Sequence, residues 1–324
     1  MLENDIFKIC CSEEFEAMAL KIFSFQYQHV QIYREFCKHL HISETSVKRL
    51  TDIPFLPIQF FKDQVVLTEG AAAEKVFTSS GTTGSVVSKH YVSKLRVYET
   101  SFTKTFKLQY GNIEDYTILA LLPSYLEREG SSLVYMVDKL IQQSNSPHSG
   151  FYLEDTSALV DKILFLEAQQ KKVLLLGVSY ALLDLIELQR FQLKNTIVME
   201  TGGMKGRRKE LIKDELHELL KNGFGVKAIH SEYGMTELLS QAYSTGNGLF
   251  TCPPWMKVFT RDPEDALTLI SKKTGGINVI DLANLYSCSF LATQDLGKIH
   301  IDQSFEILGR FDTSDIRGCN LMVL

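Results

Sequence analysis

The chain has 324 residues, a formal net charge of -5, 45% hydrophobic residues and 23% charged residues. These proportions are typical of a folded globular chain that is large enough for two closely fused lobes. The sequence has no block of basic residues and no apolar run of membrane-spanning length, which argues against a nucleic-acid partner and a transmembrane segment.

Six cysteines are scattered through the chain without any Cys-x-x-Cys pair, so the sequence predicts neither a zinc site nor a disulfide framework. The first residues are polar and acidic rather than apolar, so no signal peptide is expected. Reduced thiols and the absence of targeting features favour a cytoplasmic location. The cysteines are Cys10, Cys11, Cys37, Cys252, Cys288 and Cys319.

In chain order, the first predicted element is an amphipathic helix with Ser12 as its N-cap. Apolar residues recur at helical spacing between Phe15 and Phe23, so this stripe is expected to face the core.

A loop rich in hydroxyl groups and glycine follows Phe77. Glycines let a backbone approach an anion closely, and successive amide and hydroxyl donors can replace the water around a phosphate. The loop is not a Walker motif, because Ser85 follows the last glycine and the nearest lysine is Lys89. Considered alone, it is equally consistent with a surface linker. The candidate phosphate-binding residues are Ser79, Ser80, Gly81, Thr82, Thr83 and Gly84.

The middle of the chain alternates between strand-like apolar runs and helical patterns, which indicates an α/β fold. In such sheets, ligands bind beyond the carboxyl ends of the strands. The glycines after Met199 and the Tyr233 segment are expected at these ends. Strands are predicted at 116–122, 172–176, 196–199 and 226–229, and helices at 132–143 and 209–220.

Residues 177–181 resemble the nucleophile elbow of α/β-hydrolases, with Ser179 in the position of the nucleophile. Asp281 and His300 are available further along the chain to complete a triad. A hydrolase or thioesterase is therefore the alternative interpretation.

The segment 231–237 brings an aromatic ring, a hydroxyl and a carboxylate within one turn. Tyr233 offers a face for adenine, Thr236 a phosphate donor, and Glu237 a hard oxygen ligand for Mg2+. His230, directly before this segment, is a candidate for lining a carboxylate pocket. The alternative is a plain turn in which Tyr233 packs and Glu237 caps a helix.

Together these segments resemble signatures of the acyl-adenylate-forming superfamily, in the order found there. The loop at 77–84 resembles its phosphate loop, and 233–237 resembles its Tyr-Gly-x-Thr-Glu motif. Three further matches are Gly202-Gly203-Met204-Lys205 on the adenine side, Asp295 for the ribose hydroxyls, and Arg310 in a Gly-Arg-x-Asp hinge. The resemblance implies ATP and Mg2+ as cofactors and makes Gly202, Gly203, Tyr233, Gly234, Thr236, Asp295 and Arg310 nucleotide-binding candidates.

Within the superfamily, the LuxE-type acyl-protein synthetases are the most similar group, on the segments 53–62, 122–127 and 317–322. The resemblance implies mixed sheets flanked by helices, the N-terminal domain of the luciferase and acyl-CoA synthetase fold, truncated at the C-terminus. It places an adenylate-forming core at 1–310 and a remnant of the hinge and C-terminal region at 311–324.

The LuxE-type enzymes are acylated on a cysteine near the C-terminus, and Cys319 is in the matching position. A thiolate is a strong nucleophile, and Arg317 nearby could lower the thiol pKa. The expected function is ATP-dependent activation of a carboxylic acid, expected to be a fatty acid, and transfer to this thiol. Thr236, Glu237, Lys205 and His230 are the other catalytic candidates, with Glu237 on the metal.

An acyl reductase is the expected partner protein. An aryl- or acyl-CoA ligase and a non-catalytic nucleotide-binding subunit remain alternatives, because nothing in the sequence fixes the acyl pocket.

Overall fold

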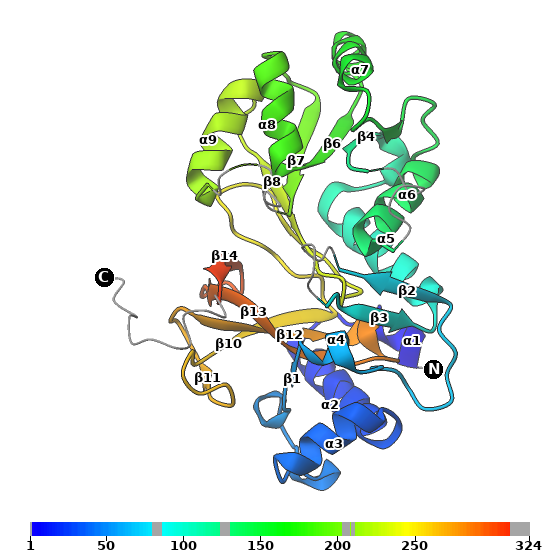
Figure 1. Ribbon diagram of the computed structural model, residues 1–324, viewed down its shortest axis with the longest axis vertical. Helices are drawn as coiled ribbons and strands as arrows, with labels where there is room; N and C mark the ends of the chain where they lie inside the picture. Colours follow the sequence, from blue (N-terminus) through cyan, green and yellow to red (C-terminus); the bar gives the residue numbers. More distant parts are fainter. Residues whose placement is uncertain (1, 80–85, 124–129, 203–207, 209–210, 312–324) are drawn as a thin grey trace. The chain divides into compact units, whose positions relative to one another are not determined.

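The computed structural model describes residues 2–79, 86–123, 130–202, 208 and 211–311 (Figure 1). The chain divides into two compact units. Unit 1 comprises residues 1–60, 66–69 and 254–324, and unit 2 comprises residues 61–65 and 70–253.

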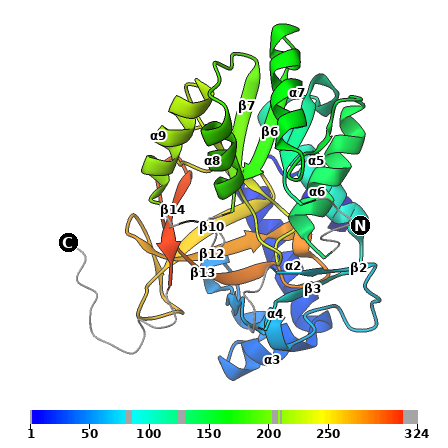
Figure 2. The same cartoon turned by 45° about the horizontal axis from the view of Figure 1, so that its top comes forward.

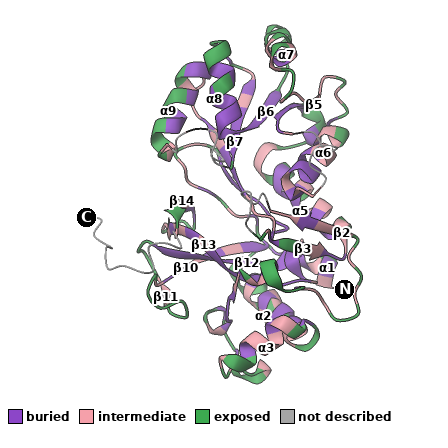
Figure 3. Cartoon of the chain, viewed as in Figure 1, coloured by how far each residue is buried: buried purple, intermediate pink, exposed green. Residues whose placement is uncertain are grey.

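Unit 2 contains a six-stranded sheet in the order β5-β4-β6-β7-β8-β9. All neighbouring strands are parallel except β9, which runs antiparallel to β8. The central strands are buried along their whole length, as apolar strands covered on both faces are (Figure 3). The strands are β4 (Thr117–Leu121), β5 (Gly150–Phe151), β6 (Val173–Val178), β7 (Thr196–Thr201), β8 (His230–Tyr233) and β9 (Ala242–Ser244).

Helices cover both faces of this sheet: α8 and α9 lie on one side of the strands, and α5 and α6 on the other (Figures 1 and 2). Capping residues determine where several of these helices begin or end. The side chains of Ser131 and Asp155 cap α6 and α7, and Gly225 ends α9 in the left-handed conformation. The helices are α5 (Leu95–Tyr110), α6 (Ser132–Ser144), α7 (Thr156–Ala168), α8 (Ser179–Leu188) and α9 (Lys213–Phe224).

Unit 2 also contains an antiparallel hairpin of β2 (Lys75–Thr78) and β3 (Lys89–Val92). Phe77 lies opposite His90 in its register, and both side chains are fully buried. The hydroxyl-rich loop begins directly after β2, so its two ends are held by this pair of strands.

Unit 1 is built on a second mixed sheet in the order β1-β13-β12-β10-β11, with β14 paired to β13. Helices α1, α2 and α3 belong to this unit, whereas the short α4 (Phe60–Asp63) begins at the end of the segment 1–60 and continues into unit 2. The elements of unit 1 are α1 (Leu2–Ile6), α2 (Ser12–His29), α3 (Gln31–His39), β1 (Leu56–Pro57), β10 (Met256–Arg261), β11 (Leu269–Ile270), β12 (Gly275–Asp281), β13 (Phe290–Ile299) and β14 (Phe305–Arg310).

Buried polar groups hold unit 1 together. The guanidinium of Arg261 donates to the carbonyl of Ile277 at 2.8 Å, to the Asn278 side chain at 2.7 Å and to the carbonyl of Thr293 at 2.5 Å. Through these hydrogen bonds, a single buried side chain of β10 links that strand to β12 and β13. On α2, the side-chain amide of Gln26 donates to the carbonyl of Asn284 at 2.9 Å.

The predicted mixed α/β architecture with helices on the sheets is confirmed. The predicted helix at the start of the chain is α2, although Cys11, and not Ser12, occupies its N-cap position. The strand predicted at 226–229 is wrong: the strand is the next four residues, β8. The helix predicted at 209–220 begins only at Lys213.

None of the helices in the described ranges is both long and apolar enough to span a lipid bilayer. The domain division expected at residue 310 stays a prediction, since 312–324 lie outside the described residues.

Candidate functional site

The base of the hydroxyl-rich loop is closed by Ser79 and Ser88. The amide of Ser79 donates to the carbonyl of Ser88 at 3.1 Å, and the amide of Ser88 donates to the Ser79 hydroxyl at 2.9 Å. This reciprocal pair extends the hairpin by one step beyond β2 and β3. The remaining loop candidates, residues 80–84, lie outside the described residues.

The Tyr-Gly-Met-Thr-Glu segment begins at the last residue of β8 and continues past the carboxyl end of that strand. The Tyr233 ring lies 5.8 Å from the Phe250 ring and is only 8% exposed, so a neighbouring aromatic side chain already packs against it. Thr236 is half-buried, and Glu237 is buried. The segment is thus at the edge of the sheet where ligands of α/β folds bind.

A hydrogen bond joins this segment to the hairpin. Nδ1 of His90 donates to the main-chain carbonyl of Thr236 at 2.8 Å, although 146 residues separate them in the chain. A carbonyl only accepts, so the proton is on Nδ1 and Nε2 keeps a lone pair. Burial lowers the pKa of His90 to about 4, despite the opposing effect of the Thr236 carbonyl, so the ring is neutral near pH 7. The base of the candidate phosphate loop and the candidate adenine segment are therefore held side by side.

A polar cluster is formed by the buried residues Glu200, His217 and Ser231 and the partly exposed Lys213. It lies near the carboxyl end of β7, where Glu200 pairs with the second residue of β8. A carboxylate oxygen of Glu200 is 3.4 Å from Nζ of Lys213 and 3.5 Å from Nε2 of His217. The same histidine nitrogen is 3.4 Å from the Ser231 hydroxyl.

The charges of this cluster compensate one another. Burial acts to raise the pKa of Glu200, but the hydrogen bond with His217 and the charge of Lys213 outweigh it and lower the pKa. Burial lowers the pKa of Lys213, and Glu200 opposes that effect. Nζ of Lys213 also lies 4.2 Å from the centre of the Phe250 ring, which in turn packs on Tyr233. The cluster thus supports the signature segment through Phe250.

A second buried carboxyl group belongs to Glu232. Its oxygen accepts a hydrogen bond from the Thr201 hydroxyl at 2.5 Å. Burial raises its pKa to about 7, Thr201 opposes this, and the charge of Glu200 adds to it. A Cβ atom on Gly234 would lie too close to its other oxygen. The glycine of the signature therefore leaves room for the Glu232 carboxyl group.

The glycine turn after β7 is described only at its first residue. Gly202 has a φ of 67°, a left-handed conformation that favours glycine, and its carbonyl accepts from the Ser179 hydroxyl at 2.9 Å. Gly203 and Lys205 lie outside the described residues.

The contacts of Ser179 do not fit a hydrolase. Ser179 is buried, and among the described residues its hydroxyl contacts Gly202 and Glu200 and no histidine. The expected triad partners have other contacts: Asp281 accepts from the amide of Ala283, and His300 lies 3.3 Å from Glu306. The serine at the start of α8 therefore positions the glycine turn.

His230 is the first residue of β8, three positions before Tyr233. Its Nδ1 lies 3.2 Å from the Tyr110 hydroxyl, and burial lowers its pKa. This contact ties the amino end of β8 to α5. A role for His230 in chemistry stays a prediction.

Asp295 and Arg310 are brought together within unit 1. They lie opposite each other in the β13–β14 register, and Nε of Arg310 is 2.9 Å from the Asp295 carboxylate. The aspartate is buried, whereas the arginine side chain is 71% exposed. Cys319 lies outside the described residues.

The sequence analysis missed His90, Glu200, Lys213, His217 and Glu232. For Glu200 a signal existed, because an acidic residue follows a short apolar run and only Thr201 separates it from two glycines. His90 gave no signal, since its partner is a main-chain atom distant in the chain.

Comparisons with known proteins show the family and the fold of the chain. The family model described as "Acyl-protein synthetase, LuxE" matches residues 10–324. A long-chain-fatty-acid–luciferin-component ligase of Vibrio harveyi is 24% identical, over 92% of this chain and 84% of the relative.

Solved structures share the fold at low sequence identity. An open conformation of 2-hydroxyisobutyryl-CoA ligase in complex with 2-HIB-AMP and CoA has a TM-score of 0.68 at 13% identity, over 94% of this chain and 72% of that one. ATP-bound MatB from Rhodopseudomonas palustris has a TM-score of 0.55 at 21% identity, over 75% of this chain and 49% of that one. The chain shares its fold with these two proteins, and it belongs to the LuxE acyl-protein synthetase family.

Proposed function

We propose that this protein activates a carboxylic acid with ATP and transfers the acyl group to the thiol of Cys319. The observation that carries the proposal is the hydrogen bond from His90 to the Thr236 carbonyl at 2.8 Å. It holds the base of a loop suited to phosphate beside a segment suited to adenine and magnesium. The family match and the nucleotide-bound structures with the same fold support this use of the site.

In the first step, a carboxylate oxygen attacks the α-phosphorus of ATP, and the bond to pyrophosphate breaks. Hydroxyl and amide donors of residues 79–84 and the Thr236 hydroxyl would stabilise the charge on the phosphates. Glu237, a buried carboxylate at the end of the segment, offers the oxygen chemistry that Mg2+ prefers. When bound, the ion would neutralise phosphate charge. We assign the adenine to the Tyr233 side and the ribose to Asp295 and Arg310.

In the second step, the Cys319 thiol loses its proton and its sulfur attacks the acyl carbon, so a thioester forms and AMP leaves. The thioester would then pass to a partner such as an acyl reductase. His230 and Lys205 are retained as candidates for contacting the substrate carboxylate.

A fatty acid is the proposed substrate, because the relative from Vibrio harveyi is a long-chain-fatty-acid ligase by name. Two alternatives remain testable. A CoA ligase would place the acyl group on coenzyme A, and a binding-only subunit would hold nucleotide without chemistry.

Exchange of labelled pyrophosphate into ATP separates the two steps, because it measures the reversible first step alone. We expect fatty-acid-dependent exchange in the wild type and in Cys319→Ser, and its loss in Glu237→Ala. Acylated protein, detected by mass spectrometry after incubation with ATP and acid, should be absent in Cys319→Ser. Cys252→Ser is the matched control and should retain both activities.

Loss of exchange in Cys319→Ser would refute the division into two steps. A binding-only subunit would instead show stabilisation by ATP in a thermal-shift assay with no exchange. Acyl-CoA formation without acylated protein would identify a CoA ligase.

A further inference from the structure

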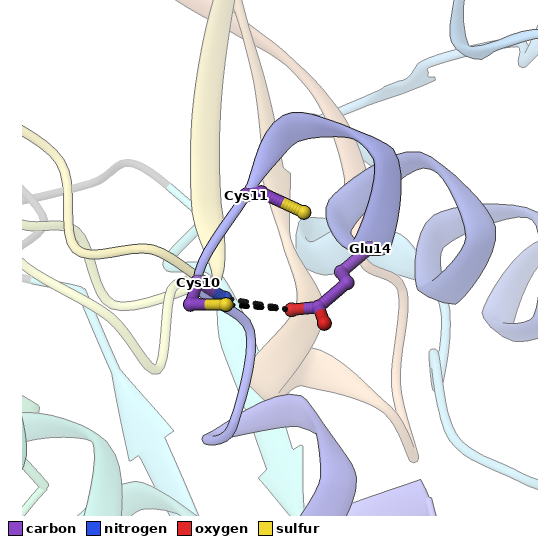
Figure 4. A group of neighbouring side chains, drawn as sticks. All are labelled: Cys10, Cys11 and Glu14. Atoms are coloured by element: carbon purple, nitrogen blue, oxygen red, sulfur yellow. Dashed lines mark hydrogen bonds between the residues drawn. The ribbon is translucent and has the colours of Figure 1, made fainter.

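Two adjacent thiols and a carboxylate gather at the start of α2 in unit 1 (Figure 4). One ligand atom each from Cys10, Cys11 and Glu14 lies within 4.8 Å of the others, and all three residues are exposed. The sulfur of Cys10 is 3.2 Å from the Glu14 carboxylate. The sequence analysis predicted no metal site here, because the spacing is not Cys-x-x-Cys.

The local backbone fixes this arrangement. Cys11 is the N-cap of α2, and Glu14 is the third residue of the helix. A carboxylate at that position reaches back over the first turn, and the Glu14 oxygen accepts from the Cys10 amide at 2.9 Å. The carboxylate is therefore held beside the thiol before any ligand arrives.

The segment that leads into the helix is also anchored. Phe7 packs edge to face on Trp255 with ring centres 5.0 Å apart, and Glu3 on α1 accepts a hydrogen bond from the Tyr286 hydroxyl. Both contacts lie within unit 1. Side-chain contacts therefore hold the segment that precedes the two cysteines in place.

We propose that Cys10, Cys11 and Glu14 bind one thiophilic divalent cation of the zinc type, with two thiolates and one carboxylate as ligands and water in the fourth position. Zinc takes sulfur at about 2.3 Å and carboxylate oxygen at about 2.0–2.2 Å in a tetrahedral shell, which separates sulfur and oxygen ligands by about 3.6 Å. The 3.2 Å between the Cys10 sulfur and the Glu14 oxygen is close to that separation. Mg2+ prefers octahedral oxygen ligands, so this site is chemically distinct from the one assigned to Glu237.

The proton balance follows from the contacts. Without a cation, the Cys10 thiol donates a hydrogen bond to the Glu14 carboxylate. Each thiol releases its proton as its sulfur–metal bond forms, while the Glu14 carboxylate is already ionised. Two protons leave as one divalent cation binds, so the net charge of the site is unchanged and binding tightens with rising pH.

Titration of the reduced, metal-free full chain with Cd2+ tests the site, because cadmium thiolates give a charge-transfer absorption band. We expect this band to saturate at one equivalent and to be displaced by Zn2+ but not by Mg2+. Cys10→Ser and Cys11→Ser should each remove the one-equivalent phase. Glu14→Gln should weaken binding about tenfold or more. In the wild type alone, Zn2+ should also raise the melting temperature.

Glu215→Gln is the matched control, because Glu215 is an exposed carboxylate at the third position of α9, the position that Glu14 has in α2, and it lies outside the cluster. It should bind Cd2+ within about twofold of the wild type, as should Cys252→Ser. Equal affinities for Glu14→Gln and Glu215→Gln, or a one-equivalent phase that persists in the Cys10→Ser/Cys11→Ser double variant, would overturn the proposal.

Discussion

Nδ1 of His90 donates to the carbonyl of Thr236, and this contact holds the β2–β3 hairpin against the segment that follows β8. His90 is fully buried, and its ring meets Phe61 edge to face with centres 5.5 Å apart. Its Nε2 has no hydrogen-bond partner within the described part of the chain. The histidine is therefore a positioning residue, because its Nδ1 hydrogen bond holds the signature segment in place.

Removal of this donor should misplace Thr236. We expect His90→Phe to lower the free energy of unfolding by about 1–3 kcal/mol, since the carbonyl of the half-buried Thr236 loses its hydrogen-bond donor. The rate of pyrophosphate exchange should also fall, because the KM for ATP should rise more than the KM for the acid. His90→Asn, whose amide can donate from nearly the position of Nδ1, should restore much of both. Equal KM values for ATP in the wild type and His90→Phe would contradict the positioning role.

Glu232 should make the protein less stable as the pH rises. Its folded-state pKa is about 7 against an ordinary value of 4.5, so between these values the folded state holds a proton that the unfolded state has released. Urea unfolding from pH 5 to pH 8 should show the wild type losing about 2–3 kcal/mol relative to Glu232→Gln, which cannot ionise. Parallel pH profiles for the two proteins would exclude the raised pKa.

Replacing one member of the Glu200–Lys213 pair should lower the free energy of unfolding more than replacing both members. Lys213→Met removes the lysine charge and leaves the buried Glu200 carboxylate with His217 and serine hydroxyls as partners. We expect a loss of about 1–3 kcal/mol, below the full range for buried pairs because Lys213 is partly exposed. The double variant Glu200→Gln/Lys213→Met should recover part of this loss. A double-mutant cycle by urea unfolding measures the coupling, and a coupling near zero would show that the two groups act independently.

Gly234→Ala should be destabilising, because the new Cβ atom would meet the Glu232 carboxyl group. That group cannot easily move, since it is buried and bonded to Thr201. We expect a cost of about 1–3 kcal/mol and weaker exchange activity. The matched control is Gly150→Ala, whose Cβ would be 3.6 Å from the Tyr152 ring, an ordinary contact.

The role of Glu232 in that clash can be tested directly. In a Glu232→Ala background, Gly234→Ala should add little further loss, because the obstructing carboxyl group is gone. A full additional loss would place the obstruction elsewhere.

The sequence predicted the apolar part of unit 2 well and its polar part poorly. β4, β6 and the first part of β7 were recognised because they are largely apolar runs, typical of parallel strands buried on both faces. β8 was missed because its residues, His-Ser-Glu-Tyr, look like a turn. Their burial depends on hydrogen-bond partners such as Thr201 and His217, which come from other elements.

The candidate site could be predicted only where its residues form local motifs. The order of Gly202, Tyr233, Asp295 and Arg310 in the chain was informative without a structure. The contacts that orient these motifs were not, because they join residues far apart. The N-cap of α2 was misplaced by one residue, since Ser12 is a good capping residue but Cys11 occupies the position.

The link between His90 and residue 236 uses a main-chain acceptor, and every amino acid carries that same oxygen. Substitution of the side chain at position 236 therefore leaves this hydrogen bond intact. Position 90, in contrast, must keep a side chain of similar length that can donate a hydrogen bond. In related sequences, the side chain at position 236 and its contacts with a nucleotide can therefore change, while a donor at position 90 keeps the two segments aligned.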